Sequence, residues 1–424
     1  QESLALSLGG MFGVLVGMSL LVPAAAKVML RALESGFRRW PAFSARWAIR
    51  SVRRSLSRTS VALAALMVAL AVTIGLGAMI ANFRATVDEW LSLTLKADLY
   101  VSTPLGSGSR PEGDIASDWE DRLGSLPGVA AVEPFRAVVV GSEFGLVQLS
   151  VVDGRRTRDA GLYRFAEGTA AEVWDAVQGG AAIVSESFAL RHGLRPGDRL
   201  TLQTDRGEST FPVEAVFYDY TTGQGTVMIT HDVYHRFWDD RQVSSLGIFL
   251  EPHADPASVA DSVRAELFDS GLRLTSHRDL RIRALEIFDR SFAVTSALRW
   301  LAVLVAGVGV LSALLALQLE RGRELATLQV LGMTPADLGR LTLLETGLMG
   351  LLAGLLSIPT GLVLAWILTQ VINQRSFGWT IPWVPTAEPI AVALALGLAA
   401  SCAASIYPWW RLSRLPLVES LRAE

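Results

Sequence analysis

Five long apolar stretches constrain the fold of this chain more than any other feature of its sequence. A helix that crosses the hydrocarbon core of a membrane needs about 20 predominantly apolar residues. Five stretches meet this requirement: Leu4–Leu30, Val61–Phe83, Trp300–Leu319, Leu341–Ile372 and Ala387–Trp410. We therefore expect a membrane α-helical bundle of five spans, with one large polar insertion, residues 84–290, between the second and third spans.

The charge of the chain is divided unevenly between the insertion and the apolar part. Residues 84–290 contain 32 acidic and 21 basic residues, a net charge of −11, whereas the rest contains 17 basic and 9 acidic residues, a net charge of +8. The two values sum to the −3 of the whole 424-residue chain. Together with a hydrophobic content of 51%, this division is typical of a membrane protein with one sizeable soluble domain.

The basic residues predict which ends of the spans face the cytoplasm. Residues 31–58 contain eight arginines and one acid, Glu34, and positively charged loops stay on the cytoplasmic side of a membrane. Counting spans from this loop places the insertion outside and returns residues 321–340 and the C-terminal tail to the cytoplasm. In the outer connection between the last two spans, Trp379 and Trp383 are expected to anchor at the membrane interface.

The segment 41–60 has a helical pattern of its own. Phe43, Trp47, Val52 and Leu56 recur at roughly helical spacing, with arginines between them. A basic amphipathic helix of this kind is suited to lie on the cytoplasmic surface of the membrane. The same arginines can serve as a topological anchor alone, and the sequence leaves both interpretations open.

The insertion is predicted to contain a compact extracytoplasmic α+β domain over residues 97–278. Short strands and helices alternate in segments such as FPVEAVFYDY, GTVMIT, SLGIFLEP and PASVADSVRAELFDSG. Helical spacing continues beyond the second span to residue 96 and begins before the third span at residue 279. We therefore expect the two flanking helices to extend outward as a paired stalk.

Motifs that would give the chain an enzymatic activity of its own are absent from the sequence. It contains no G-x-x-x-x-G-K-[ST] nucleotide-binding loop, no G-x-S-x-G, no H-E-x-x-H and no C-x-x-C. His231 and His235 have the i, i+4 spacing of metal ligands, but two histidines specify little, and surface histidines are the better interpretation. The basic cluster 153–159 is best interpreted as a solvated turn, with an anion-binding patch as the alternative. We predict no catalytic residue, metal or cofactor on this chain, and no nucleic-acid partner.

Small residues in the apolar stretches indicate close packing between helices. Gly347, Gly350 and Gly354 have the spacing of helix-packing glycines, and Pro359 predicts a kink. Cys402, the only cysteine, is expected to be a packing residue as well. No ionisable side chain is placed at the mid-membrane depth that a proton relay requires, which argues against a proton-coupled transporter.

Three motifs at distant positions point to one protein family. The first is E-R-x-R-E-x-A-x-L-x-x-L-G-M-T at 320–334, with Glu345 downstream. The second is GLRPGDRLTL at 193–202, and the third is the tail PLVESLRAE at 416–424. Together they resemble the FtsX-like permease family, the membrane subunits of ABC transporters of the macrolide-exporter and lipoprotein-releasing kind. The family's ending is P-x-E-A-L-R-x-E, so Ser420 replaces the usual Ala.

The resemblance implies a role for the cytoplasmic segment 320–334. In such permeases the corresponding helix docks in a groove of a separate ATPase subunit, which carries the ATP and Mg. Without the resemblance, an ordinary connection between two helices with solvated charges explains the segment equally well. The residues expected to couple to the ATPase are Arg321, Arg323, Glu324, Leu325, Leu328, Leu331, Gly332, Met333, Glu345, Glu419, Leu421 and Arg422.

The resemblance also implies a domain arrangement. Residues 1–40 resemble the central transmembrane span of a longer, two-repeat permease, so the chain is expected to be its C-terminal half. The further divisions are the surface helix 41–60, the span and stalk 61–96, the domain 97–278, and the stalk with three spans 279–424. The implied location is a bacterial inner membrane, crossed several times, with residues 84–290 in the periplasm.

The implied function is that of a permease subunit without enzymatic activity, in which ATP hydrolysis by a separate ATPase moves the periplasmic domain. Such a machine would export or extract a lipid, lipoprotein, peptide or drug. The expected partners are an ABC ATPase dimer, a first permease repeat on the same or another chain, membrane lipids, and a periplasmic adaptor or substrate-binding protein. The alternative is a mechanotransmitter or regulator that transports nothing and acts on a periplasmic partner such as a cell-wall hydrolase.

Overall fold

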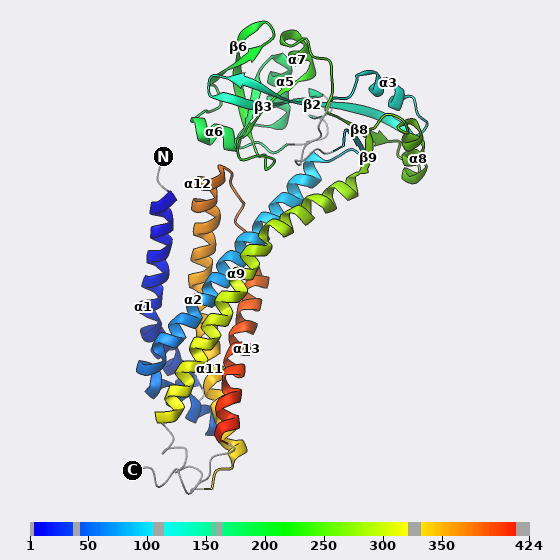
Figure 1. Cartoon of the computed structure of the whole chain (residues 1–424). Helices are drawn as coiled ribbons and strands as arrows, with labels where there is room; N and C mark the ends of the chain where they lie inside the picture. Colours follow the sequence, from blue (N-terminus) through cyan, green and yellow to red (C-terminus); the bar gives the residue numbers. More distant parts are fainter. Residues whose placement is uncertain are drawn as a thin grey trace. The chain divides into compact units, whose positions relative to one another are not determined.

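The structure is a computed structural model that describes residues 4–36, 43–104, 114–154, 157, 163–320 and 332–412 (Figure 1). The chain divides into two compact units. Unit 1 comprises Gln1–Phe83, Arg290–Arg375 and Ile381–Glu424, and unit 2 comprises Arg84–Asp289 and Ser376–Thr380. The polar insertion predicted from the charge distribution is therefore very nearly the longer part of unit 2.

Unit 1 is built from α-helices (Figure 1). They are α1 (Leu4–Gly36), most of α2 (Phe43–Thr94) and of α9 (His277–Glu320), α11 (Pro335–Trp366), the π-helix η2 (Ile367–Ile372), α12 (Asn373–Phe377) and α13 (Ala387–Leu412). Among the described residues, four helical stretches are long and apolar enough to cross a membrane: Leu4–Gly36, Thr59–Thr94, Ala336–Phe377 and Ala387–Ile406. The other predicted span, 300–319, lies within α9, where many side chains are outside the described part of the chain. The count of five spans therefore stays a prediction.

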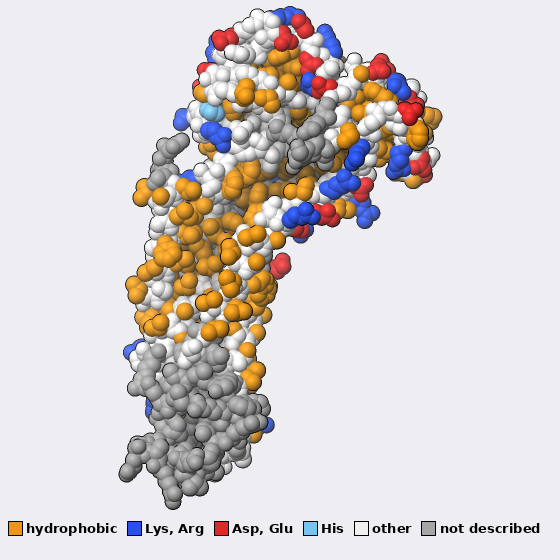
Figure 2. Space-filling view, viewed as in Figure 1, with side chains coloured by type: hydrophobic (Ala, Val, Ile, Leu, Met, Phe, Trp, Pro, Cys, Tyr) orange, Lys and Arg blue, Asp and Glu red, His pale blue; other side chains and the backbone are white. Residues whose placement is uncertain are grey.

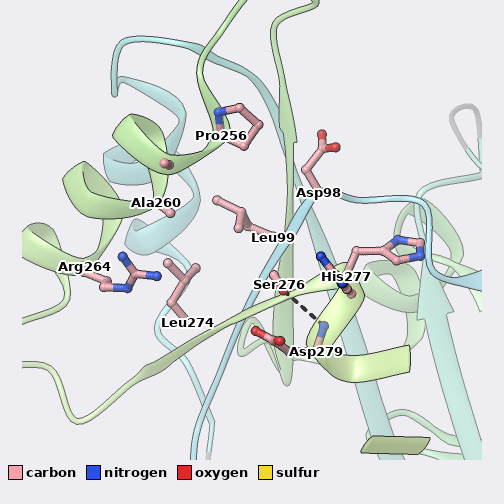
Figure 3. Close-up of a pocket in the computed structure, with 11 residues that line it drawn as sticks. Asp98, Leu99, Pro256, Ala260, Arg264, Leu274, Ser276, His277 and Asp279 are labelled. Carbon is pink, nitrogen blue, oxygen red and sulfur yellow. Dashed lines mark hydrogen bonds between the residues drawn. The ribbon is translucent and has the colours of Figure 1, made fainter. Parts of the chain in front are cut away.

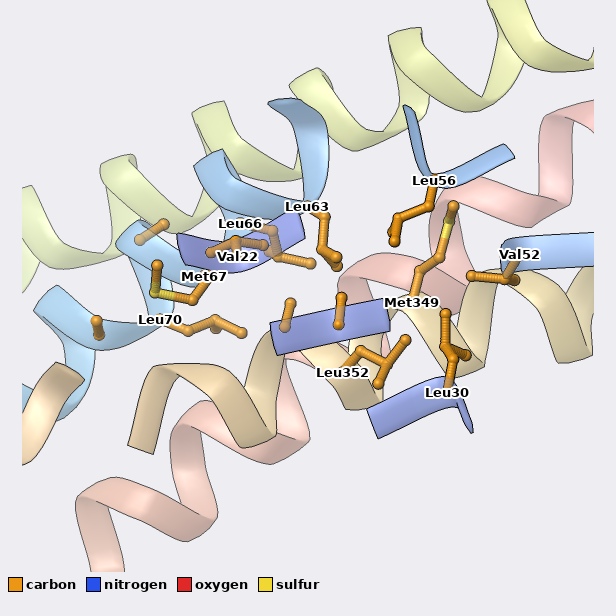
Figure 4. Packing of buried hydrophobic residues seen from close by; sticks show 14 of the residues in the cluster. Val22, Leu30, Val52, Leu56, Leu63, Leu66, Met67, Leu70, Met349 and Leu352 are labelled. Carbon is orange, nitrogen blue, oxygen red and sulfur yellow. The ribbon is translucent and has the colours of Figure 1, made fainter. Parts of the chain in front are cut away.

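The core of unit 1 is apolar and is formed by α1, α2, α11 and α13. Figure 4 shows Leu30 of α1 and Leu70 of α2 in the same cluster as Met349 and Leu352 of α11. Other large apolar side chains of α1 point outward, and Leu20 is 75% exposed. Figure 2 shows apolar side chains covering the described surface of these helices, whereas charged side chains gather on unit 2. An apolar exterior around an apolar core is what a membrane requires.

No break separates the predicted surface helix 41–60 from the second span. The helix α2 is continuous from Phe43 to Thr94. In its first part, Ile49, Val52 and Leu56 are buried in the core of unit 1, whereas Trp47 is 40% exposed. Part of the apolar face predicted for the membrane surface is thus used for packing between helices.

Unit 2 is built around a mixed β-sheet. Within the described residues, nine strands follow the order β3-β7-β4-β6-β5-β2-β8-β1-β9. The strands are β1 (Leu99–Ser102), β2 (Val129–Ser142), β3 (Gly145–Val152), β4 (Ala182–Ser185), β5 (Arg199–Thr204), β6 (Gly207–Phe217), β7 (Thr226–Thr230), β8 (Ser245–Leu250) and β9 (Arg273–Ser276). Strand β2 belongs to both halves of the sheet, because its first part pairs with β8 and its second part pairs with β3.

Each half of the sheet has its own apolar core. The half formed by β8, β1 and β9 packs against α3 (Asp118–Gly124) and α8 (Pro256–Glu266). The other half packs against α5 (Ala170–Gly179), α6 (Glu186–His192) and α7 (His231–Phe237). Unit 2 is therefore two small layered structures that share the strand β2.

Local sequence explains where the helices of unit 2 begin. Thr169 and Glu172 form a reciprocal capping box at the start of α5. At α8, the Asp255 carboxylate accepts hydrogen bonds from the backbone N–H groups of Ala257 and Ser258. The strands β6, β7 and β8 and the helix α8, predicted from the four quoted segments, are present. Strand β3 and the helices α5 and α7 were not predicted.

Candidate functional site

Most of the predicted ATPase-coupling residues lie outside the described part of the chain. This holds for Arg321, Arg323, Glu324, Leu325, Leu328 and Leu331, and for Glu419, Leu421 and Arg422 of the tail. The structure describes Gly332, Met333 and Glu345. Their role in coupling therefore stays a prediction, and only the turn that follows the predicted coupling helix can be described.

That turn is built to start α11 at a fixed residue. Gly332 has a φ of 98°, a left-handed conformation that glycine adopts without steric cost. Thr334 caps the helix: its hydroxyl oxygen accepts from the N–H of Asp337 at 3.2 Å, and the Asp337 carboxylate accepts from the N–H of Thr334 at 3.3 Å. Pro335 follows at the first helical position. The capping box and Pro335 together define the residue at which α11 begins.

Glu345 lies further along α11, about three turns beyond the cap, and is half-buried. Its neighbours Thr342 and Thr346 are buried, and each hydroxyl donates to a backbone carbonyl of the same helix, at 3.0 and 3.1 Å. The structure thus places Glu345 on the same helix as the turn, but not in the turn.

Glycines set the closest contacts between the helices of unit 1. A Cβ atom added to Gly350 of α11 would lie 2.6 Å from the carbonyl oxygen of Gly397 in α13, and one added to Gly354 would lie 2.8 Å from Leu394. A Cβ on Gly361 would lie 2.6 Å from Ile74 of α2. Gly350 and Gly354 confirm the predicted close packing, whereas Gly347 has open space around it.

A π-helical segment interrupts the α-helical geometry beyond α11. Residues Ile367–Ile372 form η2, and the backbone then returns to α-helix in α12. Within η2, Gln370 donates from its amide nitrogen to the carbonyl of Ile381 at 2.7 Å. Such π-helical turns are rare and are frequent at functional sites. The π-helix η2 lies just before Arg375, the residue after which the chain passes from unit 1 to unit 2.

The last two residues of α12 and the three that follow it form what we call the docking segment, Ser376–Thr380. It belongs to unit 2, although the residues before and after it belong to unit 1. Thr380 donates from its backbone N–H to the Glu186 carboxylate at 2.7 Å and from its hydroxyl at 2.5 Å. The Tyr220 hydroxyl donates to the Thr380 carbonyl at 3.0 Å. Three hydrogen bonds therefore hold one residue of this segment against α6 and the loop after β6.

Aromatic rings extend this contact to the outer end of α2. Trp379 packs edge-on against Tyr220, with ring centroids 5.8 Å apart, and Tyr220 packs in the same way against Trp90 at 6.1 Å. Trp379 is 9% exposed. Its side chain therefore packs inside unit 2. The sequence had instead predicted that Trp379 anchors at the membrane interface. Gly378 makes the approach possible, because it has a φ of 78° and its added Cβ would lie 3.2 Å from the Cα of Ser187.

Burial changes the acidity of Glu186. It raises the pKa of the carboxyl above its ordinary value, while the two hydrogen bonds from Thr380 act in the opposite direction without cancelling the effect. Protonation of Glu186 is therefore coupled to how the docking segment is held. Neither Glu186 nor Thr380 was predicted; the run Phe377-Gly378-Trp379, a glycine between two aromatic residues in a polar loop, is the signal that points to a packed segment.

Ion pairs join the last part of α2 to the first part of α9, and both parts belong to unit 2. Arg281 of α9 binds the Asp88 carboxylate of α2 through two nitrogens, at 2.8 and 2.7 Å. Arg84 of α2 binds Asp289 of α9 at 3.0 Å. The last part of α2 and the first part of α9 are thus paired, whereas their role as an outward stalk stays a prediction.

A buried charge network lies where β2 passes from one half of the sheet to the other. The side chain of Arg136 is 10% exposed and binds Asp240 through Nε at 2.8 Å; it also binds Asp114. The Tyr234 hydroxyl donates to Asp240 at 2.9 Å. Burial alone would raise the pKa of Asp240, but the hydrogen bonds from Gln242 N–H and the Tyr234 hydroxyl, together with the charge of Arg136, bring it below its usual value.

His231 and His235 both belong to α7 of unit 2. His231 is half-buried and pairs with the carbonyl of Pro134 at 3.0 Å, and burial lowers its pKa. His235 lies beside it, with ring centroids 5.8 Å apart. Among the described residues, no group of three His, Cys, Asp or Glu side chains could hold a metal ion. The predicted basic cluster 153–159 lies largely outside the described residues.

The cavity, shown in Figure 3, has a volume of about 430 Å³ and lies between α8, β1, β9 and the start of α9. Its lining carries both signs of charge, from Asp98, Asp279 and Arg264. At its edge the N–H of Asp279 donates to the Ser276 hydroxyl at 3.1 Å. The cavity thus adjoins the residue where a strand of unit 2 becomes the helix α9.

Two protein families match this chain. Residues 59–266 match the MacB-like periplasmic core domain, and residues 297–417 match the FtsX-like permease C-terminal domain. The chain is also 37% identical, over 428 residues, to the uncharacterized ABC transporter permease protein Rv0987 of Mycobacterium tuberculosis. That alignment covers all of this chain and 50% of the relative, so the chain spans about half the relative's length.

Two solved structures are similar to part of this chain. The periplasmic region of MacB from Actinobacillus actinomycetemcomitans matches with a TM-score of 0.32 and 10% identity, over 46% of this chain and 95% of that one. The extracellular domain of the noncanonic ABC-type transporter YknZ from Gram-positive bacteria matches with a TM-score of 0.31 and 12% identity, over 43% of this chain and 100% of that one.

Apolar helices of spanning length and a periplasmic-type domain with a β-sheet define the class of protein as an ABC transporter permease. Within that class, the chain belongs to the FtsX-like permease family and carries a MacB-like periplasmic core domain. The family resemblance of the motifs at 320–334 and 193–202 is thereby confirmed. Permeases of this family are generally not enzymes, and their class in general works with an ATPase partner.

Proposed function

We propose that this permease converts ATP hydrolysis by a separate ATPase dimer into movement of unit 2, which exports or extracts a lipid, lipoprotein, peptide or drug. The observation that carries the proposal is the continuity of α2 and α9. The boundaries between units fall at 83/84 and 289/290, and both lie inside unbroken helices. A continuous helix that belongs to both units would give a displacement in one unit a direct route to the other.

The proposed membrane arrangement follows from charge. We place five spans in a bacterial inner membrane, with α9 supplying the span that the described residues leave uncounted. The arginines of 31–58 lie in the cytoplasm and unit 2 in the periplasm. Because the chain spans half of its relative, we also propose that it functions together with a first permease repeat, on the same or another chain.

The proposed ATPase contact comprises the segment 320–334 and the tail residues Glu419, Leu421 and Arg422. The capped turn at Thr334 supports this assignment, because it fixes where α11 begins after the contact. Arg321 and Glu324 would supply charges to the ATPase groove, and Leu331 an apolar contact. No ATP, Mg or other cofactor is expected on this chain, and a periplasmic adaptor or substrate-binding protein remains an expected partner.

Affinity purification in mild detergent, with and without a non-hydrolysable ATP analogue, tests the contact. We expect a P-loop ATPase to co-purify with the intact chain and to be lost from the triple variant Arg321→Ala/Glu324→Ala/Leu331→Ala. Arg340→Ala is the matched control, because Arg340 is 80% exposed on the next helix. An ATPase that binds the triple variant as well as the intact chain would overturn the assignment. A cell-wall hydrolase crosslinked to unit 2, with no substrate movement in vesicles, would favour the regulatory alternative.

A further inference from the structure

A basic pocket lies between the end of α1 and the first turns of α2, within unit 1. It has a volume of about 310 Å³ and is lined by Arg31, Glu34 and Ser35 of α1 and by Arg46 and Arg50 of α2. Three of its five lining side chains are thus guanidinium groups, against one carboxylate. Guanidinium groups match the geometry of phosphate oxygens and can bind them through two nitrogens at once.

The single carboxylate of the pocket is already occupied. One oxygen of Glu34 accepts from Arg50 Nε at 3.0 Å, and the other accepts from Arg53 at 2.6 Å. Within the described part of the chain, neither Arg31 nor Arg46 is paired with a carboxylate. Glu34 therefore holds Arg50 in place, and two guanidinium groups on different helices keep their hydrogen-bond donors for a ligand.

The surroundings of the pocket favour a lipid over a small soluble anion. Arg31 lies near the end of α1, a candidate membrane span from Leu4 to Gly36. Val28, one turn before it, is 63% exposed, and Trp47, next to Arg46, is 40% exposed. Charged donors at the end of an apolar helix, bordered by exposed apolar side chains, provide for both the phosphate and the acyl chains of one molecule.

We propose that this pocket binds the phosphate diester of an anionic phospholipid, with Arg31 and Arg46 as the phosphate ligands. Glu34 is a positioning residue, because it acts only through Arg50 and Arg53. The bound lipid joins the end of α1 to the start of α2. The lipid pocket shares no residue with the proposed ATPase contact. Failure of the ATPase proposal would therefore leave the lipid proposal testable, and the reverse also holds.

Native mass spectrometry of the full chain, from mixed micelles with equal amounts of phosphatidylglycerol and phosphatidylcholine, measures the retained lipid. We expect phosphatidylglycerol to be retained preferentially. Arg31→Gln and Arg46→Gln should each lower its retention about tenfold, the loss expected for one charge-assisted hydrogen bond to the phosphate. Arg54→Gln is the control: Arg54 is exposed on α2 and does not line the pocket, so retention should stay unchanged.

Three outcomes would overturn the proposal. An equal loss in the Arg54 and Arg46 variants would mean diffuse attraction to the helix surface. Equal retention of phosphatidylcholine would mean that the phosphate charge is not recognised. Displacement of the lipid by an excess of inorganic phosphate alone would assign the pocket to a soluble anion. Because Arg31 and Arg46 lie on different helices, either variant tests the site if the other fails to fold.

Discussion

Unit 1 and unit 2 are each stabilised internally by a different kind of buried side chain. Unit 1 closes around leucines and glycines: Leu70 and Leu352 are fully buried, and Gly350 lets α11 and α13 approach so closely that a single added carbon meets the opposite backbone. Unit 2 also has apolar cores, but the strand shared by its two halves carries a buried arginine, Arg136, between two carboxylates.

The difference follows from the surroundings of each unit. In a membrane the outer surface is apolar as well, so hydrophobic burial does little to select one helix packing over another, and close van der Waals contact at small residues decides. In water, apolar burial drives folding, and a buried charge network can fix how the two halves of the sheet meet. Unit 1 should therefore be sensitive to added volume, and unit 2 to lost charge.

The largest effect is expected from Arg136→Met. The substitution leaves Asp240 without its cationic partner in a poorly solvated site, and breaking such a network costs about 3 to 5 kcal/mol of unfolding free energy. Because Asp114 is 40% exposed, the lower end of that range is expected. Urea-dependent proteolysis of unit 2 in the full chain measures the loss.

Arg206→Met is the matched control for that experiment. Arg206 is 58% exposed and lies 3.6 Å from the exposed Asp239, so the change should stay within about 0.5 kcal/mol. If Arg136→Met were no more sensitive to protease than Arg206→Met, the buried network would not be what holds the halves of the sheet together.

In unit 1, Gly350→Ala is expected to be the most damaging small substitution. The added Cβ would lie 2.6 Å from the Gly397 carbonyl and 2.4 Å from the Ser401 hydroxyl, and overpacking of this kind costs about 1 to 3 kcal/mol. Gly347→Ala, on the same helix, meets nothing within 4 Å and should be neutral or slightly stabilising. Thermal unfolding in detergent compares the two; equal melting temperatures would contradict the close-packing account.

A pH dependence is expected at the docking segment. Because burial raises the pKa of Glu186, the folded state binds more protons than the unfolded chain between the ordinary and the folded-state pKa. The contribution of protonated Glu186 to the stability of the folded state is therefore complete below the ordinary pKa. It is lost as the pH rises through the folded-state pKa.

Urea-dependent proteolysis of unit 2, compared at acidic and neutral pH, measures this dependence. The stability difference between the unmodified chain and Glu186→Gln should favour the unmodified chain more at acidic pH, because the hydrogen bonds from Thr380 do not cancel the effect of burial on the Glu186 pKa. Glu214→Gln, an exposed substitution on β6, should leave the pH dependence intact. A stability difference that is independent of pH would contradict a raised pKa of Glu186 in the folded state.

The smallest effect is expected in the stalk. Asp88→Asn removes the carboxylate charge that binds Arg281, but both side chains are about two-fifths exposed, so the loss should not exceed about 1 kcal/mol. The loss should shrink further at high salt, because exposed ion pairs are screened. Chemical denaturation at low and high ionic strength measures both; a larger or salt-independent loss would mean that the pair is effectively buried.

The elements that the sequence predicted well are those with strong periodicity. Apolar runs of spanning length identified α1, α11 and α13, and alternation of apolar and polar residues identified β6. Strand β3 was not predicted because its sequence, GLVQLSVV, has no clear alternation at its buried end. Helices α5 and α7 are short, at 10 and 7 residues, and a short helix presents too few turns for its period to stand out.

The residues of the candidate site were likewise predictable only where they form a local sequence pattern. The motif at 320–334 was recognisable because it is contiguous in sequence. The contact of Thr380 with Glu186 joins residues 194 positions apart, and neither residue belongs to a local pattern. Trp379 was expected at the membrane interface because aromatic residues at the ends of spans usually lie there. Its packing against Tyr220 depends on the fold of unit 2, which no local pattern describes.

The central claim is that the state of the ATPase is transmitted through α2 and α9 to unit 2, and a distance measurement between the two helices tests it most directly. Replacing Cys402, the only cysteine, gives a background in which Ala85→Cys and Glu286→Cys carry spin labels on exposed positions of α2 and α9. With the ATPase bound, we predict that the label-to-label distance distribution changes between ADP and a non-hydrolysable ATP analogue, and that the Arg321→Ala/Glu324→Ala/Leu331→Ala variant shows no change. An identical distribution in both nucleotide states, with the ATPase still bound, would contradict the account.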